Sequence, residues 1–90
     1  MKLILYSKPG CHLCEGLQEK LEQIQSLNLE LEVRDITSRE DWFQAYQYEV
    51  PVLKRYSDGR EEPITRPSPR STVKQLEQML QKYLPGSEQK

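Results

Sequence analysis

Two residues of this sequence, Cys11 and Cys14, have the type and spacing that redox chemistry needs, and they are its only cysteines. In a helix, residues three apart have Cα atoms about 5 Å apart, which a disulfide bond accepts. Cys11 falls where an apolar stretch gives way to a helical pattern, beside the free N–H groups of a helix N-terminus. Such a position lowers the pKa of a thiol. We therefore expect Cys11 to attack disulfides and Cys14 to resolve the mixed disulfide.

Other roles for the cysteine pair remain open. The segment Met1 to Ser7 is too short for a secretory signal, which favours a reducing compartment, where structural disulfides rarely persist. A zinc site needs four ligands, and the single histidine, His12, lies inside the motif and is badly placed to complete one. An iron–sulfur carrier would take thiolates from two chains. The two thiols could also be inert.

Composition sets limits on the function classes. A chain of 90 residues forms one domain with a thin core. No apolar run approaches the ~18 residues of a membrane span, and a net charge of −1 argues against nucleic acid as a partner. Acidic residues gather in the middle of the chain and basic residues toward its ends, which indicates either two solvated faces or a basic rim for an anionic substrate. We expect a cytoplasmic monomer that binds no nucleic acid and no membrane.

The elements that must position the cysteines follow from apolar periodicity. In chain order, the patterns predict a strand at 2–7, a helix from 11 to about 26, a strand at 29–36, a short helix opening at the capping sequence 38–41, strands at 52–56 and 61–64, and a helix from 71 or 72 to about 84. The first half is a βαβ unit with parallel strands, and the second half is an antiparallel hairpin turning at Asp58-Gly59. Together they predict an α/β fold, with one four-stranded mixed sheet and helices on both faces.

Side-chain patterns assign the faces of these elements. The first helix has an apolar stripe made of Leu13, Leu17, Leu21 and Ile24. The strand at 29–36 alternates apolar and charged residues and belongs at a sheet edge, and Pro63 places the strand at 61–64 at an edge or makes it a fragment. Buried sides of the short helix and the last helix are predicted at Trp42, Phe43 and Tyr46, and at Val73, Leu76, Met79, Leu80, Tyr83 and Leu84. The domain would span 1–84, with a frayed tail at 85–90.

Two segments of the chain resemble glutaredoxins. The first resembles their active-site segment, in which Tyr-Ser-Lys precedes a Cys-x-x-Cys pair, and reads Tyr6-Ser7-Lys8-Pro9-Gly10-Cys11-His12-Leu13-Cys14. The second, Val50-Pro51-Val52, resembles the family's Val-Pro step, whose proline is cis and faces the nucleophile. The chain is most similar to a subgroup of small glutaredoxin-like proteins of poorly assigned function with Cys-x-Leu-Cys. This resemblance implies a thioredoxin-like fold of order β-α-β-α-β-β-α and thiol-disulfide oxidoreductase activity.

Three departures from the family bear on glutathione. His12 stands where glutaredoxins usually have proline, and Leu13 where they usually have tyrosine. The Gly-Gly-x-x-Asp stretch that helps to hold glutathione is replaced by Ile64-Thr65-Arg66-Pro67-Ser68-Pro69. We therefore expect glutathione to be at most a weak co-substrate, and we expect no bound cofactor or metal.

Roles are also predicted for residues around the cysteines, and those of Lys8, Val50 and Pro51 follow from the same resemblance. Lys8 would stabilise the thiolate and pair with a substrate carboxylate, and the Val50 backbone would pair with an extended peptide beside a cis Pro51. His12 could favour the thiolate when it is charged, and Arg66 and Arg70 could hold a carboxylate by forked hydrogen bonds.

The expected partners are a disulfide-bearing protein or small thiol and an unidentified reductant. The alternative functions are a peptide-binding module without turnover and a metal or iron–sulfur carrier.

Overall fold

Strand β1 (Lys2–Ser7) crosses the centre of the molecule because its side chains are apolar on both faces. In the computed structural model, which describes residues 1–83, Leu3 and Leu5 face one side of the sheet, and Ile4 and Tyr6 face the other. These four side chains are almost completely buried. The continuous apolar run at the start of the sequence is therefore the central strand of the fold.

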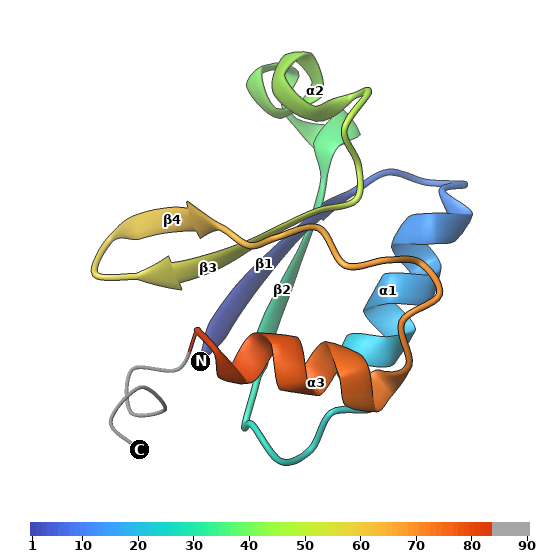
Figure 1. Cartoon of the computed structure of the whole chain (residues 1–90). Helices are drawn as coiled ribbons and strands as arrows, with labels where there is room; N and C mark the ends of the chain where they lie inside the picture. The colour runs from blue at the N-terminus through green and yellow to red at the C-terminus, as the bar shows by residue number, and fades with distance from the viewer. Residues whose placement is uncertain (84–90) are drawn as a thin grey trace.

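The sheet has the mixed order that the sequence predicts. Within residues 1–83, four strands pair in the order β2-β1-β3-β4. Strand β2 (Glu30–Asp35) runs parallel to β1, whereas β3 (Val52–Ser57) pairs antiparallel with β1 and with β4 (Arg60–Pro63). Strands β2 and β4 form the two edges, as predicted for both (Figure 1).

Two helices cover one face of the sheet. Helix α1 (His12–Glu22) and helix α3 (Val73–Gln81) pack on the side to which Leu3 and Leu5 point. Thr72 caps α3 with its side chain and forms a reciprocal capping box with Gln75, which fixes the start of this helix. The core on this face also includes Leu17, Leu21, Ile24, Leu27, Leu53, Ile64, Leu76 and Leu80.

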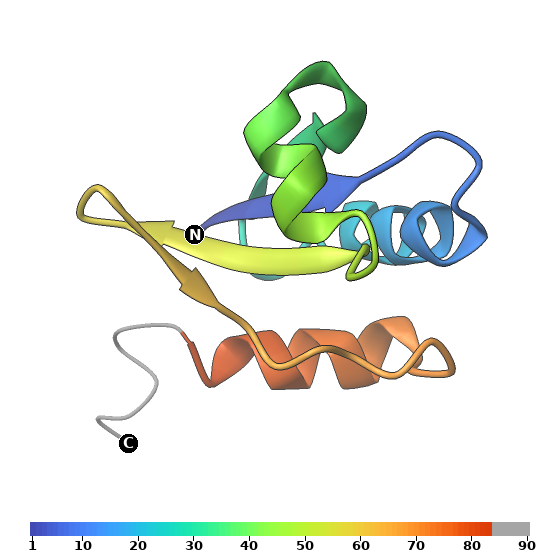
Figure 2. The ribbon, with the colours of Figure 1, turned by 90° about the horizontal axis from the view of Figure 1, so that it is seen from above.

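The opposite face carries an aromatic cluster. The short turn η1 (Ile36–Ser38) and helix α2 (Glu40–Tyr46) place Trp42, Phe43 and Tyr46 against Ile4 and Tyr6. Figure 2 shows α2 and α3 on opposite sides of the sheet. The fold is thus the predicted thioredoxin-like one, with helices on both faces.

A polar group closes the edge of the aromatic cluster. The Tyr6 hydroxyl donates to a Glu61 carboxylate oxygen over 2.6 Å and accepts from the Arg34 guanidinium over 2.9 Å. The same guanidinium lies over the Trp42 ring. Burial, together with the bond to Glu61, raises the pKa of Tyr6 above its usual value. The charged side of β2 is therefore partly covered rather than fully solvated. Tyr6 and Trp42 both pack in this cluster, as predicted for Trp42.

The prediction for the apolar stripe of α1 was wrong at Leu13. Its side chain is 55% exposed, and Cys14 takes the buried position in the first helical turn. Positions 14, 17 and 21 follow the helical repeat as well as 13, 17 and 21 do, and the geometry of the turn decides between them. The helix also ends at Glu22 instead of about Ser26, although Ile24 remains buried in the connection that follows.

Smaller corrections concern the boundaries of other elements. Strand β2 is shorter than predicted because Ile36 belongs to η1, and Val33 is 41% exposed at the sheet edge. Ser38 does not cap α2; its hydroxyl donates to the Asp35 carbonyl, and Arg39 is the N-cap residue.

The expected Leu84 contact and the expected tail at 85–90 lie outside the described residues. Residues 1–83 contain no helix long and apolar enough to span a membrane.

Candidate active site

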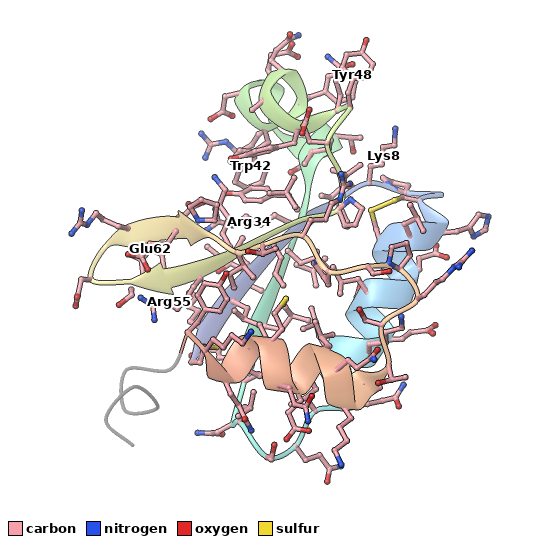
Figure 3. The ribbon with its side chains drawn as sticks, viewed as in Figure 1. Lys8, Arg34, Trp42, Tyr48, Arg55 and Glu62 are labelled. Carbon is pink, nitrogen blue, oxygen red and sulfur yellow. A yellow bond between two sulfur atoms is a disulfide. The ribbon has the colours of Figure 1, made fainter. Side chains whose placement is uncertain are left out.

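Cys11 and Cys14 are joined by a disulfide bond across the first turn of α1, with Cα atoms 5.2 Å apart. Cys11 is the N-cap residue and has an extended backbone, and its sulfur accepts a hydrogen bond from the Cys14 N–H over 3.2 Å. Cys11 is partly exposed, whereas Cys14 is 2% exposed. The disulfide lies at the N-terminal end of α1 in Figure 3. Cys11 is therefore the more accessible cysteine of the pair.

The same hydrogen bond has a consequence for the reduced protein. A backbone N–H aimed at a sulfur stabilises the thiolate more than the neutral thiol, because the interaction with an ion is stronger. The position of Cys11 at the helix start adds the field of the helix dipole. Both effects act on Cys11 and favour its ionisation, which is what a nucleophilic thiol requires.

The peptide bond between Val50 and Pro51 is cis, as the resemblance implied. It lies immediately before β3, and Pro51 is buried. The Val50 N–H donates to the Tyr46 carbonyl over 3.1 Å, and the Val50 carbonyl accepts from Arg66 over 3.2 Å. The strand-like pairing expected between Val50 and a peptide would therefore have to replace the bond to Tyr46.

Arg66 holds the segment before the cis bond. Besides the bond to Val50, its guanidinium donates to the Glu49 carbonyl over 2.8 Å. This places a residue of the β4–α3 connection directly on the loop that precedes β3. Arg66 is therefore seen positioning the protein's own backbone. Arg70, in the same connection, is exposed, and its N–H donates to the Ser68 hydroxyl.

We expect the Arg66→Gln variant to be less stable by about 1 kcal/mol, because two hydrogen bonds from a charged but exposed group are lost. The rate at which the protein reduces a substrate disulfide should fall, because the loop before Pro51 loses the support of Arg66. The Arg70→Gln variant is the matched control and should leave both properties unchanged. Urea unfolding and single-turnover reduction kinetics measure the two effects. Equal behaviour of the two variants would contradict the positioning role of Arg66.

The other residues expected around the cysteines lie at the exposed rim. The Lys8 carbonyl accepts from the Cys11 N–H over 3.3 Å, and the Lys8 side chain is exposed and points outward from the molecule (Figure 3). The His12 side chain is 95% exposed, with Nδ1 3.6 Å from a Glu15 carboxylate oxygen. Tyr48, in the turn before the cis bond, is 88% exposed, and no sequence pattern singled it out. The residue-level roles of Lys8 and His12 stay predictions.

A cavity of about 510 Å³ opens beside the cysteine motif, between α1 and the β4–α3 connection. Lys20 Nζ donates to the Pro69 carbonyl over 2.8 Å and so ties the outer wall to α1. Two features of the sequence could have indicated this cavity. They are Gly16 inside the helix and the proline-rich segment in place of the Gly-Gly-x-x-Asp stretch. Its lining residues are His12, Leu13, Gly16, Leu17, Lys20, Pro51, Arg66, Pro67, Ser68 and Pro69.

In the part of the chain that the structure describes, no three side chains of histidine, cysteine, aspartate or glutamate gather closely enough to hold a metal ion.

Comparisons with known proteins agree with this arrangement. The model of the family described as glutaredoxin-like domain (DUF836) matches residues 2–81. A solved structure of thioredoxin 1 from the thermophilic eubacterium Thermosipho africanus is similar in fold, with a TM-score of 0.66 and 20% sequence identity over 98% of this chain and 99% of that one. Among curated protein sequences, none matches this chain. Because the family model covers nearly the whole described chain, including both cysteines and the cis proline, the protein belongs to the glutaredoxin-like domain family (DUF836).

Proposed function

We propose that the protein is a dithiol thiol-disulfide oxidoreductase. The observation that carries this proposal is the disulfide bond between a partly exposed Cys11 at the start of α1 and a buried Cys14 one turn away. In the reduced protein, the Cys11 thiolate attacks one sulfur of a substrate disulfide, and the other sulfur leaves as a thiolate. Cys14, once deprotonated, then attacks the Cys11 sulfur and releases the second substrate thiol.

The products of this cycle balance. The substrate gains two electrons and two protons and becomes two thiols, and the protein is left with its intramolecular disulfide. A dithiol reductant or a reductase must then reduce the Cys11–Cys14 bond before the next turnover. The substrate would be a disulfide-bearing protein or a small disulfide.

Turnover with excess substrate tests the proposal. The reduced protein should lose two hydrogens on reaction with a disulfide, as measured by intact mass, and should catalyse many cycles when a dithiol reductant is supplied. The double variant Cys11→Ser/Cys14→Ser is the control for uncatalysed exchange. Binding of a disulfide peptide without any turnover would favour a binding module, and a coloured protein with stoichiometric iron would favour a carrier.

Glutathione should couple poorly to this cycle. The ammonium group of glutathione needs a carboxylate partner, whereas the charged residues that line the cavity within the described chain are cationic, at Lys20 and Arg66. Losing one charge-assisted contact costs about 1.5–3 kcal/mol, or roughly ten- to a hundredfold in affinity. We expect reduction of a mixed glutathione disulfide to be slower by about that factor than with an ordinary dithiol glutaredoxin, assayed side by side. Comparable rates would show that other residues hold the ammonium group.

A further inference from the structure

Gly16 lies in the interior of α1, where glycine is unfavourable by roughly 1 kcal/mol relative to alanine. A glycine in a helix is often explained by close packing against a neighbouring element. Here a Cβ atom at Gly16 would meet no heavy atom of the described chain within 4 Å, apart from its two chain neighbours and the backbone of its own helix. The backbone at Gly16 also has no positive φ that would require glycine. Its effect in the fold is therefore to leave space, and that space belongs to the cavity beside the cysteine motif.

The walls of this cavity combine apolar surface with positive charge. Lys20 and Arg66 line it from opposite elements, and among the described lining residues none is acidic. A volume of about 510 Å³ falls in the range of sites that take small organic ligands. The apolar lining consists of Leu13, Leu17, Pro51, Pro67 and Pro69.

The cavity is also a supported structure. Lys20 fastens its outer wall through the Pro69 carbonyl, and Arg66 fastens the other end of the same segment to the Glu49 carbonyl. Prolines at 67 and 69 limit the backbone between these two attachments. A wall held at both ends keeps its shape without a ligand, which lowers the entropic cost of binding.

The position of the cavity connects it with the redox chemistry. His12 and Leu13, the two residues between the cysteines, form part of its lining, and so does Pro51 after the cis bond. A molecule bonded through sulfur to Cys11 would therefore have its organic part next to the mouth of the cavity.

From these observations we propose that the cavity binds the organic part of a low-molecular-weight disulfide whose body is apolar and carries a carboxylate but no ammonium group. This proposal rests on the proposed function. In the step that it serves, the Cys11 thiolate forms a bond to one sulfur of the small disulfide, and the other half leaves as a thiolate. Cys14 then displaces the bound half as a second thiolate, so that the ligand is reduced and the cysteine pair oxidised.

A protein segment is a less suitable occupant. An extended peptide that joins a thioredoxin-like site pairs with backbone groups, and the Val50 N–H is already donated to Tyr46. A small anion needs no such pairing. It needs apolar contact and a cation, and Lys20 and Arg66 still have N–H groups beyond those that bond to the Pro69, Glu49 and Val50 carbonyls.

The Gly16→Leu variant tests the proposal by filling the cavity. Leucine has a higher helix propensity than glycine, and the position is free of neighbours, so the variant should fold. Gly16→Ala tests a single added carbon, and Gln18→Leu, on the same helix but outside the lining, is the matched control. The probes are dithiobis(nitrobenzoate), which is aromatic with a carboxylate, and hydroxyethyl disulfide, which is small and uncharged.

We expect Gly16→Leu to lower the rate constant for reaction with dithiobis(nitrobenzoate) by about tenfold, equivalent to ~1.4 kcal/mol. The reaction with hydroxyethyl disulfide should stay unchanged, and Gln18→Leu should change neither rate. High salt should slow only the carboxylate probe, because it screens the cationic walls. Oxidised wild-type protein should also bind nitrobenzoate with NMR shifts at the amides of Gly16 and Leu17.

Several outcomes would overturn the proposal while leaving the proposed function intact. If Gly16→Leu reacts like the wild type with both probes, the cavity is not used. If it slows both probes equally, the substitution acts on Cys11 itself. If it slows reduction of a disulfide peptide but not of dithiobis(nitrobenzoate), the cavity serves a protein segment.

A different outcome would overturn the proposed function as well. If the wild type transfers no electrons to any disulfide, the proposed function itself fails.

Discussion

Replacing Cys11 with serine is expected to abolish disulfide reduction, whereas replacing Cys14 should stop the reaction after its first step. Loss of a nucleophile typically lowers the rate by about 10³-fold or more, because no neighbouring group can take its place. Cys11 is the accessible sulfur, and Cys14 is 2% exposed, so serine at 11 removes the only thiol that a substrate can reach. Stopped-flow kinetics with a chromogenic disulfide measure this loss.

The Cys14→Ser variant should instead accumulate a mixed disulfide. Its Cys11 thiolate still attacks, but the second displacement lacks its nucleophile, and a substrate half remains bonded to the protein. Intact mass spectrometry followed by peptide mapping should find this adduct on Cys11. An adduct on Cys14 in the Cys11→Ser variant, formed at a comparable rate, would reverse the assignment of the two sulfurs.

Alkylation of the reduced wild-type protein checks the same assignment without a substitution. The Cys14 N–H and the helix start both stabilise a thiolate at Cys11. At a pH near 6, Cys11 should therefore be labelled well before Cys14. Because unfolding removes both the hydrogen bond and the shelter of Cys14, protein alkylated in denaturant provides the control and should label both residues equally.

The order of elements could be read from the sequence because each pattern has a local cause. The apolar run of β1, the Asp58-Gly59 turn and the Thr72 cap depend on residues that are neighbours in the chain. The change from an apolar run to a helical pattern after β1 predicted that both cysteines lie at the start of α1. These features survive in the folded protein because burial and local hydrogen bonding favour the same structure.

The cavity and its fastenings could not be read in this way. The bonds from Arg66 to Glu49 and from Lys20 to Pro69 join segments that are distant in the chain. The local sequence around an arginine does not show whether its side chain lies in solvent, binds a ligand or donates to a carbonyl far away in the chain. Glycine is unfavourable inside any helix, but only the packing around Gly16 shows that the space beside it is empty.

Leucines at positions 13 and 21 should differ sharply in their contribution to stability, although one helical pattern placed both in the core. Leu21 is 2% exposed and packs in the cluster between α1, α3 and the sheet, whereas Leu13 is 55% exposed. Removing a buried leucine side chain typically costs about 2–5 kcal/mol, including the cavity that it leaves. Leu21→Ala should therefore lower the free energy of unfolding by that amount.

The Leu13→Ala variant is the matched comparison, and its free energy of unfolding should stay within about 0.5 kcal/mol of the wild type. Urea titrations with a common m-value measure both variants. Because Leu13 lines the cavity next to the cysteines, its loss should still slow the reaction with dithiobis(nitrobenzoate). A large destabilisation by Leu13→Ala would mean that this side chain packs in the core and that Cys14 does not hold the buried position. Unchanged stability with slower reaction would instead mean that an apolar residue between two cysteines is placed outward to meet the substrate.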